Sequence, residues 1–318
     1  MNTSMDIHFP DFTENGSPTD QGCLRNPCNI VSSAYHYVLV RFRGTHVNKR
    51  VNERMLDSKA IHEDRFLTLK RETWETPEGR KIRIRKCYKN RVAKKYLKNE
   101  KAILRAAQGP NIVPLIETED KNILMPYAGE TLLCILSRDR SRGLPLPKFE
   151  NYARQLMQGV AHMHQSGIWH LDLKLGNLLA DESDEDKLSI IDFGLSQRGG
   201  PAKQKEFCSE GYKPPEMFHR GYKTISVKTD IFSAGVVLFE LLTNYILFPH
   251  PINIRNKQYM ANQASYYEYL DDRLKEVEAI DKGCAEDKHY AKLIRSMLAW
   301  NPEDRPDANV VLDCFMRS

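Results

Sequence analysis

Two short segments in the middle of the chain constrain its fold more than any other part of the sequence. The first is His170–Asn177 (HLDLKLGN), and the second, fifteen residues after Asn177, is Asp192–Gly194 (DFG). The first segment has an acid five residues before an amide, and the second has an acid just before a glycine. This pattern supplies one proton acceptor and two oxygen ligands for Mg²⁺, which are the groups that phosphoryl transfer requires.

The first segment resembles the catalytic loop of protein kinases, H-R-D-L-x-x-x-N, at every fixed position except the Arg, and the second is the D-F-G that follows it in that family. By this resemblance, which covers about residues 64–316, the chain is identified as a divergent, serine/threonine-like member of the eukaryotic-type protein kinases. The resemblance implies an α+β, bilobal fold with a small β-rich N-lobe, a larger helical C-lobe and ATP in the cleft. It also implies an N-terminal extension at residues 1–60 and a kinase domain at 61–318, divided into lobes at 61–128 and 129–318.

The composition agrees with one globular domain of two lobes, or with two small domains. The chain has 318 residues, of which 41% are hydrophobic and 28% charged, and this is enough to bury a core. A net charge of +5 does not by itself indicate nucleic-acid binding, which we do not expect. No apolar run reaches the roughly 18–20 residues of a membrane span, and the polar, acidic stretch Met1–Asp20 is no signal peptide. Seven scattered cysteines indicate reduced thiols, so we expect a cytoplasmic or nuclear protein.

Hydrophobic periodicity predicts a strand-rich first part and a mostly helical second part. Residues 1–30 are rich in polar and turn-forming residues and are expected to be flexible, and residues 41–64 have no clear pattern. Strands are expected at residues 33–40, 66–69, 81–87, 112–116, 123–125 and 188–191. Helices are expected at residues 92–107, 149–165 and 231–242. The last of these is apolar nearly all round, which indicates a buried central helix.

Within the resemblance, Asp172 corresponds to the catalytic base that accepts the proton of a substrate hydroxyl. Lys174 can reach the transferring phosphate, and a lysine at this offset resembles serine/threonine kinases. Asn177 and Asp192 are expected to hold Mg²⁺ through oxygen atoms, and Leu179 is expected to contact the nucleotide. A lone Asp most often caps a turn, but the recurrence of Asn177 and Asp192 at the family spacing favours the catalytic interpretation of Asp172.

An acid on the apolar face of the helix predicted at residues 92–107 needs a partner. Glu100 lies three residues after Leu97 and four before Leu104, and an ionised acid that faces a core is costly to bury alone. Lys86 ends the preceding strand, so an ion pair between Lys86 and Glu100 is expected. The alternative is a solvated Glu in a basic helix. The resemblance implies that Lys86 and Glu100 are catalytic residues and that Lys86 contacts the α- and β-phosphates of ATP.

Further positions match the adenine site of the family. Met125 matches the gatekeeper, and Tyr127 and Ala128 belong to the hinge whose backbone contacts adenine. Ile84 stands where a small residue usually lies above adenine, so the pocket is expected to be narrow.

Three supporting contacts are implied in the C-lobe. Ser209, in a segment that resembles the end of a kinase activation segment, is expected to contact Asp172 and Lys174 and to help shape the substrate site. Glu216 is expected to pair with Arg305, and Asp230 is expected to brace the catalytic loop from the central helix.

Two departures from the family pattern bear on function. The window expected to hold the glycine-rich loop, residues 64–71, has no glycine, and glycine lets backbone amides approach phosphates closely. Leu171 replaces the Arg that receives an activation-loop phosphate in many kinases, and Gln197–Cys208 contains no Ser, Thr or Tyr. We therefore expect no need for activation-loop phosphorylation.

Some other features have a functional and a structural interpretation. The run Arg80–Lys101 holds eleven Lys or Arg and one acid, which fits the docking of an acidic partner, although a solvated surface is the commoner explanation. His162 and His164 could bind a metal but are expected on a helix surface. Cys208 is expected to be a small structural residue and not a redox sensor.

The sequence thus predicts an ATP- and Mg²⁺-dependent serine/threonine kinase that transfers the γ-phosphoryl group to protein hydroxyls. The alternative is a pseudokinase that acts as a scaffold or allosteric partner, which the missing glycines favour. The presence of Lys86, Glu100, Asp172, Asn177 and Asp192 argues against it. Drift without catalysis is expected to lose at least one of these five residues. A third class, phosphorylation of a small molecule or lipid, is disfavoured because the activation segment resembles a protein-substrate platform.

Overall fold

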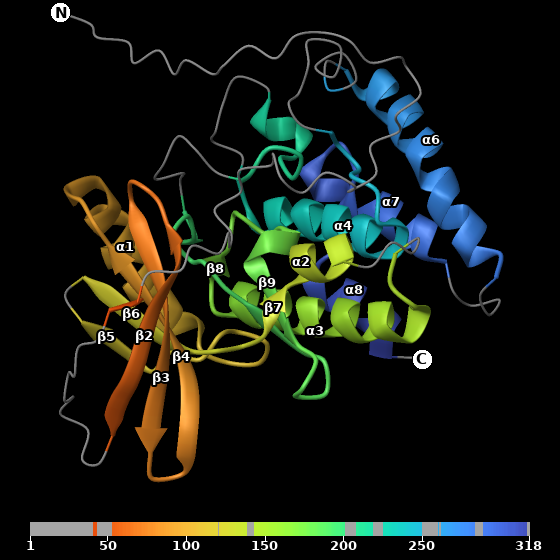
Figure 1. The fold of residues 1–318 in the computed structure, drawn as a ribbon. Helices are drawn as coiled ribbons and strands as arrows, with labels where there is room; N and C mark the ends of the chain where they lie inside the picture. Colours follow the sequence, from red (N-terminus) through yellow and green to blue (C-terminus); the bar gives the residue numbers. More distant parts are fainter. Residues whose placement is uncertain are drawn as a thin grey trace, which may run out of the picture.

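The computed structural model describes most of the chain in two lobes (Figure 1). The described residues are 41–42, 53–119, 121–138, 143–200, 208–218, 225–249, 260, 262–283 and 289–316. The tail predicted at residues 1–30 and the strand predicted at 33–40 lie outside them. Figure 1 shows a β-sheet with one helix at the left, here called the N-lobe, and a mostly helical C-lobe at the right. The α+β, two-lobed fold predicted from the sequence is confirmed.

The N-lobe is a six-stranded antiparallel sheet in the order β1-β2-β3-β4-β6-β5. Its strands are β1 (Arg41–Phe42), β2 (Arg54–Glu63), β3 (Leu67–Thr76), β4 (Gly79–Tyr88), β5 (Glu117–Glu119) and β6 (Asn122–Pro126). The β3–β4 hairpin turns at Gly79, whose φ of 109° is a conformation that favours glycine. On β4, Ile84, Lys86 and Tyr88 are buried and share one face of the strand, as the period of two predicts.

The sheet differs from the sequence prediction at three places. The unassigned region before residue 64 contains β2, so the domain start predicted at residue 61 falls inside a strand. The short strand predicted at 66–69 continues to Thr76 in β3. The strand predicted at 112–116 is wrong, because only one bridge forms there, between Ile112 and Ile190. Pro114 has no backbone N–H to donate to a ladder, and the apolar run instead fills the core.

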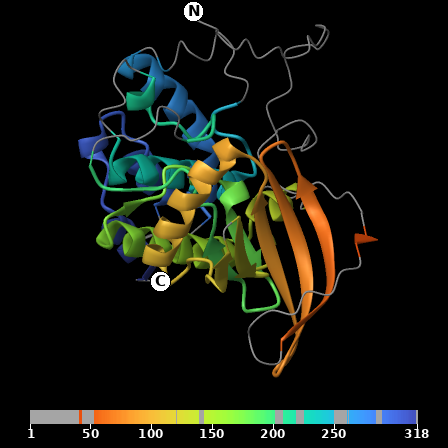
Figure 2. The same cartoon turned by 90° about the vertical axis from the view of Figure 1, so that its left-hand side faces the viewer.

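Helix α1 (Arg91–Ala107) joins the two lobes. In Figure 2 it lies in front, between the sheet and the helical part, and it contacts both β4 of the sheet and β11 (Gln197–Arg198) of the C-lobe. Its inward face carries Leu97, Leu104 and, between them, the buried Glu100. The helix predicted at residues 92–107 therefore exists, and it presents Glu100 to the interior.

The C-lobe is built mostly of helices. They are α2 (Leu132–Arg138), α3 (Leu146–Gln165), α4 (Val227–Thr243), α6 (Gln263–Asp281), α7 (Tyr290–Met297) and α8 (Ala308–Met316), with single turns at Leu175–Asn177, Pro215–Met217 and Pro302–Asp304. Its short strands, besides β11, are β7 (Glu130–Thr131), β8 (Ile168–Trp169), β9 (Leu178–Asp181) and β10 (Lys187–Ile190). The strands β9 and β10 form a hairpin that holds the two functional segments on either side of it.

Helix α4 lies in the core of the C-lobe, as its apolar sequence predicts. Every residue from Thr229 to Thr243 is buried. The helix starts with a capping box. The side chain of Ser226 accepts a hydrogen bond from the backbone of the first turn, and the side chain of Thr229 accepts one from the backbone N–H of Ser226. A buried helix with a fixed start gives a rigid base for Asp230 in its first turn.

Candidate active site

The catalytic-loop segment is held by a carboxylate from the buried helix. Oδ2 of Asp230 accepts a hydrogen bond from the backbone N–H of His170 at 2.8 Å, and Oδ1 accepts one from that of Leu171 at 2.7 Å. Leu171 has a φ of 64°, which is costly for a branched side chain and is sustained only where surrounding contacts fix it. The brace that the sequence predicts for Asp230 is therefore present.

Three polar side chains, those of Asn177, Lys174 and Ser209, meet at Asp172. Nδ2 of Asn177 donates to the backbone oxygen of Asp172 at 2.8 Å and to its Oδ2 at 3.0 Å. Nζ of Lys174 lies 3.2 Å from the same Oδ2 and donates to Oγ of Ser209 at 2.6 Å. Ser209 in turn donates to Oδ1 of Asp172 from its hydroxyl at 2.9 Å and from its backbone at 2.8 Å. The carboxylate is thus fixed, and the amide oxygen of Asn177 is turned away from it.

A second group of charges links the lobes. Nζ of Lys86 lies 2.9 Å from Oε1 of Glu100 on α1 and 2.8 Å from Oδ1 of Asp192 in the C-lobe. Burial disfavours the charged amine, but the two carboxylates outweigh this effect and raise the pKa of Lys86. The ion pair predicted between Lys86 and Glu100 is present, and the alternative of a solvated Glu is excluded because Glu100 is only 2% exposed.

The two carboxylates of this group have opposite pKa shifts. Burial raises the pKa of Glu100 to about 6 in spite of its pairing with Lys86. Burial also opposes the ionisation of Asp192, but the charge and hydrogen bond of Lys86 dominate and lower its pKa to about 2. Asp192 is therefore ionised at neutral pH, as a Mg²⁺ ligand must be.

The residue after Asp192 fixes its direction. Phe193 is fully buried, with its ring centroid 5.1 Å from that of His170, edge to face. His170 also contacts the backbone oxygen of Ile191 through Nε2 at 3.0 Å. With Phe193 anchored inside, the side chain of Asp192 extends to Lys86 and remains partly exposed. Carboxylate and amide oxygen atoms suit Mg²⁺, so Asp192 and Asn177 are the residues that would hold this ion, which would neutralise phosphate charge.

The positions predicted for adenine contact lie at the junction of the lobes. Met125, in β6, is buried and pairs across the sheet with Ile84 in β4. Tyr127 and Ala128 follow β6, and the Tyr127 backbone N–H donates to Ile82. Leu179 is buried in β9.

The sheet adds an apolar cluster that was not predicted. Ile61, Leu69 and Ile84 come from the adjacent strands β2, β3 and β4 and form one hydrophobic cluster, with Leu67 packed against it. Because Ile84 belongs to this cluster, the large side chain at that position is part of the packed sheet surface beside Met125.

A tight turn occupies the window where a glycine-rich loop is expected. Oδ1 of Asp64 accepts hydrogen bonds from the backbone N–H groups of Phe66 at 2.6 Å and Leu67 at 2.8 Å, between β2 and β3. Burial opposes ionisation of Asp64, but these two hydrogen bonds and His62 lower its pKa. The turn therefore already holds an anion on amides of the kind that could bind a phosphate.

The position of the missing Arg is apolar. Leu171 packs with Cys208 and Ile225 in a small cluster, and the backbone N–H of Cys208 donates to the backbone oxygen of Leu171 at 2.8 Å. Burial raises the pKa of the Cys208 thiol well above its usual range, so the thiol stays protonated and unreactive. The structural interpretation of Cys208 is the one that its surroundings favour.

The end of the activation segment is tied to the C-lobe by the predicted ion pair. Arg305 donates to Glu216 from both terminal nitrogens, at 2.8 and 2.6 Å, and its side chain is fully buried. It also donates to the backbone oxygens of Ala299, Lys228 and Trp300. The guanidinium thus has partners on every side, which the burial of a charge requires.

The two histidines of α3, His162 and His164, each contact another element of the fold. Nε2 of His164 lies 3.0 Å from Oδ2 of Asp230, so His164 supports the brace of the catalytic loop. His162 contacts the backbone oxygens of Ala107 and Gln108, each at 3.1 Å, at the end of α1. Their expected place on a helix surface is therefore wrong, because both are half-buried at contacts with other elements. Among the residues that the structure describes, no group of three His, Cys, Asp or Glu could hold a metal.

Many charges of the basic run already have partners within the chain. Arg83 makes two hydrogen bonds of 2.9 Å to Glu53, and Arg85 makes one of 2.7 Å to Glu72. Other pairs are Lys81 with Glu78 and Lys89 with Glu63. The strand part of this run is thus largely neutralised, which supports the structural interpretation over an acidic docking face.

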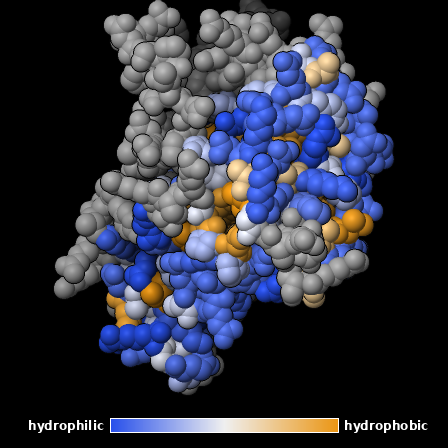
Figure 3. All heavy atoms as spheres, turned by 90° about the vertical axis from the view of Figure 1, so that its right-hand side faces the viewer, coloured by the Kyte–Doolittle hydropathy of each residue, from blue (hydrophilic) through white to orange (hydrophobic). Residues whose placement is uncertain are grey.

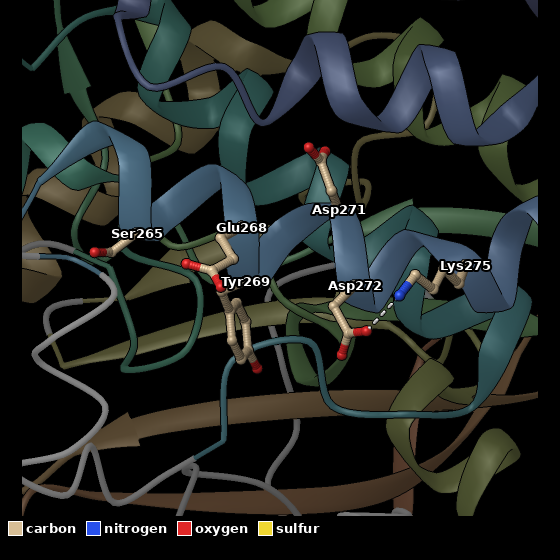
Figure 4. A pocket seen from close by; sticks show the side chains of 6 residues that line it. All are labelled: Ser265, Glu268, Tyr269, Asp271, Asp272 and Lys275. Carbon is tan, nitrogen blue, oxygen red and sulfur yellow. Dashed lines mark hydrogen bonds and ion pairs between the residues drawn. The ribbon is translucent and has the colours of Figure 1, made fainter.

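Two pockets lie on α6, away from the residues above. One is lined by Ser265, Glu268, Tyr269, Asp271, Asp272 and Lys275, with Asp272 bonded to Lys275 (Figure 4). The other lies between α6 and α7. The face on the right-hand side of Figure 1, where α6 lies, is mostly hydrophilic (Figure 3). Within the described part of the chain, no helix is both long and apolar enough to cross a membrane.

The fold and this site together define a protein kinase domain, and comparison with known proteins agrees. A protein kinase domain matches residues 73–314, so the chain belongs to the eukaryotic-type protein kinase family. Hormonally up-regulated neu tumor-associated kinase of Mus musculus is 29% identical over 290 residues, which are 86% of this chain and 38% of that protein. Its homolog in Xenopus tropicalis is 32% identical over 242 residues, 71% of this chain and 33% of that protein.

A plant relative is also similar. CBL-interacting serine/threonine-protein kinase 13 of Arabidopsis thaliana is 36% identical over 185 residues, 54% of this chain and 36% of that protein. The chain spans well under half the length of these curated relatives.

Proposed function

We propose that this protein is an active serine/threonine protein kinase that transfers the γ-phosphoryl group of Mg-ATP to protein hydroxyls. One observation carries the proposal: Lys86 bridges Glu100 of the N-lobe and Asp192 of the C-lobe while Asp172, Lys174 and Asn177 form their own bonded group. Both groups have the contacts that the family uses in catalysis. The name of the Arabidopsis relative supports serine or threonine as the acceptor.

Each side chain has a role that follows from its contacts. Asp172, held by Ser209 and Asn177, would orient a substrate hydroxyl and accept its proton. Lys174, bonded to Ser209, would face the transferring phosphate. When bound, Mg²⁺ would neutralise phosphate charge, with Asn177 and Asp192 as its protein ligands. Lys86 would hold the remaining phosphates, so that catalysis depends on positioning and charge.

The test is [γ-³²P]ATP transfer with Mg²⁺ to basic and acidic protein substrates, beside Asp172→Asn and Lys86→Met. We expect wild-type transfer and a loss of at least about 10²-fold in each variant, because removing a positioned base or cation costs this much. A signal that persists in both variants would come from a contaminating kinase. Peptide and small-molecule acceptors assayed side by side separate a protein kinase from a small-molecule kinase.

Activation without loop phosphorylation belongs to the same proposal. The apolar cluster of Leu171, Cys208 and Ile225 supports it, since these contacts join the catalytic loop to the activation segment without a phosphate. Mass spectrometry of the active protein tests it. A phosphate anywhere in residues 195–216, which include the hydroxyls of Ser196, Ser209 and Tyr212, that is necessary for activity would contradict it. The free cysteines among the described residues agree with a reducing compartment, cytoplasm or nucleus, as the place of action.

The second candidate is a pseudokinase scaffold, which the turn at Asp64 favours. Its carboxylate occupies two backbone amides in the window of the glycine-rich loop. If neither phosphoryl transfer nor a Mg-ATP-dependent change in melting temperature is found, the scaffold is the better account and binding partners become the object of study.

A further inference from the structure

The carboxylate of Glu100 has a second side-chain donor besides Lys86. Tyr88 lies two residues after Lys86 on β4, so both side chains leave the same face of the strand. Nζ of Lys86 donates to Oε1 of Glu100 at 2.9 Å, and the hydroxyl of Tyr88 donates to Oε2. The amine of Lys86 also lies 5.5 Å from the centre of the Tyr88 ring. One strand thus supplies a partner to each oxygen of the acid on α1.

The surroundings of Glu100 make the second donor important. Glu100 is 2% exposed, and Tyr88 and Lys86 are each 7% exposed. The groups that face this carboxylate are the Lys86 amine and Tyr88 hydroxyl from β4, the backbone N–H of Phe193 and the negative charge of Asp192. Burial and Asp192 both favour the protonated acid, and they raise the pKa of Glu100 to about 6. Each donor therefore has a measurable share in keeping the acid ionised at neutral pH.

We propose that Tyr88 is a positioning residue, whose hydroxyl holds the carboxylate of Glu100 in its orientation toward Lys86. The consequence concerns Asp192 as well. Lys86 is shared by two carboxylates, at 2.9 and 2.8 Å. If Glu100 gains a proton, it loses its attraction for the amine, and Lys86 remains on Asp192, a ligand that Mg²⁺ requires. The hydroxyl of Tyr88 therefore acts on the nucleotide site through Glu100, without touching the nucleotide.

The first experiment needs no catalytic activity. Melting temperatures are measured at pH 5 and pH 8 for wild type, Tyr88→Phe, Glu100→Gln and the double variant. Phe keeps the ring and its packing, so only the hydroxyl is removed. We expect Tyr88→Phe to lower the melting temperature more at pH 8, where Glu100 is ionised, than at pH 5, and we expect this difference to vanish when Glu100 is Gln. An equal effect at both pH values, or one unchanged by Glu100→Gln, would overturn the proposal.

The second experiment rests on the proposed function. The acid limb of the pH–rate profile is measured for wild type, Tyr88→Phe and Tyr96→Phe, a control on the exposed side of α1. The limb of Tyr88→Phe is expected to move up by about one pH unit, a tenfold change in proton affinity, while that of Tyr96→Phe stays in place. An unmoved limb in an active Tyr88→Phe protein would overturn the positioning role. If the wild type transferred no phosphoryl group, the proposed function would be contradicted. The melting temperatures would still test the positioning role of Tyr88.

Discussion

The buried acid Glu240 shows how a single residue can set the pH dependence of this molecule. Glu240, on the central helix α4, is 3% exposed and accepts a hydrogen bond of 2.6 Å from the Tyr212 hydroxyl. Burial dominates over the hydrogen bonds from Tyr212 and from the backbone of Leu247, and it raises the pKa of Glu240 from 4.5 to about 8. The native protein therefore keeps a proton at pH 7 that the unfolded chain loses.

This shift predicts that stability falls as the pH rises. Below pH 4.5 both states hold the proton, and between 4.5 and about 8 only the native state does. The free energy of unfolding then decreases by up to about 1.4 kcal/mol per pH unit from this residue. Urea denaturation between pH 5 and pH 8 measures it. Glu240→Gln should flatten the decrease, whereas Glu268→Gln, at an exposed position of α6, should not. Equal slopes in all three proteins would contradict the prediction.

At the scale of an element, the β2–β3 hairpin has a fixed turn at the place where the family has a flexible glycine-rich loop. Asp64 caps the amides of Phe66 and Leu67, and Lys89 donates to the backbone oxygen of Asp64 at 2.6 Å. Lys89 follows Lys86 by three residues, so the turn lies about 10 Å in the strand direction from the backbone of Lys86, the residue that is proposed to hold nucleotide phosphates. A negative charge at this place opposes nucleotide phosphates, and the amides that could bind them are occupied.

We predict that Asp64→Gly binds Mg-ATP more tightly than the wild type. The expected gain is about tenfold, or about 1.4 kcal/mol, which is the size of one hydrogen bond to a charged group. Isothermal titration calorimetry measures it. Asp64→Asn, which keeps an acceptor for the two amides but removes the charge, should fall between the two. If Asp64→Gly bound no more tightly than the wild type, the turn would have no part in nucleotide affinity.

At the scale of the whole molecule, the Glu216–Arg305 pair connects parts that are far apart in the sequence. Glu216 lies at the end of the activation segment, and Arg305 follows the turn Pro302–Asp304 before α8. The guanidinium also lies 5.0 Å from the ring centre of Phe232 on α4. The pair therefore fixes the activation segment to the core of the C-lobe.

Removing one partner of this pair should destabilise the protein strongly. Glu216→Ala leaves a buried guanidinium without its carboxylate, and a broken buried pair costs about 3–5 kcal/mol. The double variant Glu216→Ala, Arg305→Met should cost less than the sum of the two single changes, because it leaves no unpaired charge. Unfolding in urea, monitored by circular dichroism, measures all three. Additive losses would show that the two residues are not coupled.

The family and the two-lobed fold could be predicted from the order of residues alone, as could the contacts among several residues of the candidate site. Asp172, Asn177 and Asp192 could be predicted because local motifs have fixed spacings. The pair of Lys86 and Glu100 could be predicted because an acid on an apolar helix face needs a cation. The helices α1 and α4 could be predicted from the spacing of their apolar residues. In α1 these residues mark one buried face, and in α4 they cover nearly the whole helix surface.

Several contacts are not encoded in any sequence spacing and are seen only in the folded molecule. The hydroxyl of Tyr88 on Glu100, His164 on Asp230 and Leu171 against Cys208 depend on how separate elements pack. The sequence showed only that residues 64–71 contain no glycine. The turn at Asp64 could not be predicted, because it depends on which backbone amides the carboxylate reaches. A sequence states which groups are present, but the partners of a buried polar group are set by the packing that surrounds it.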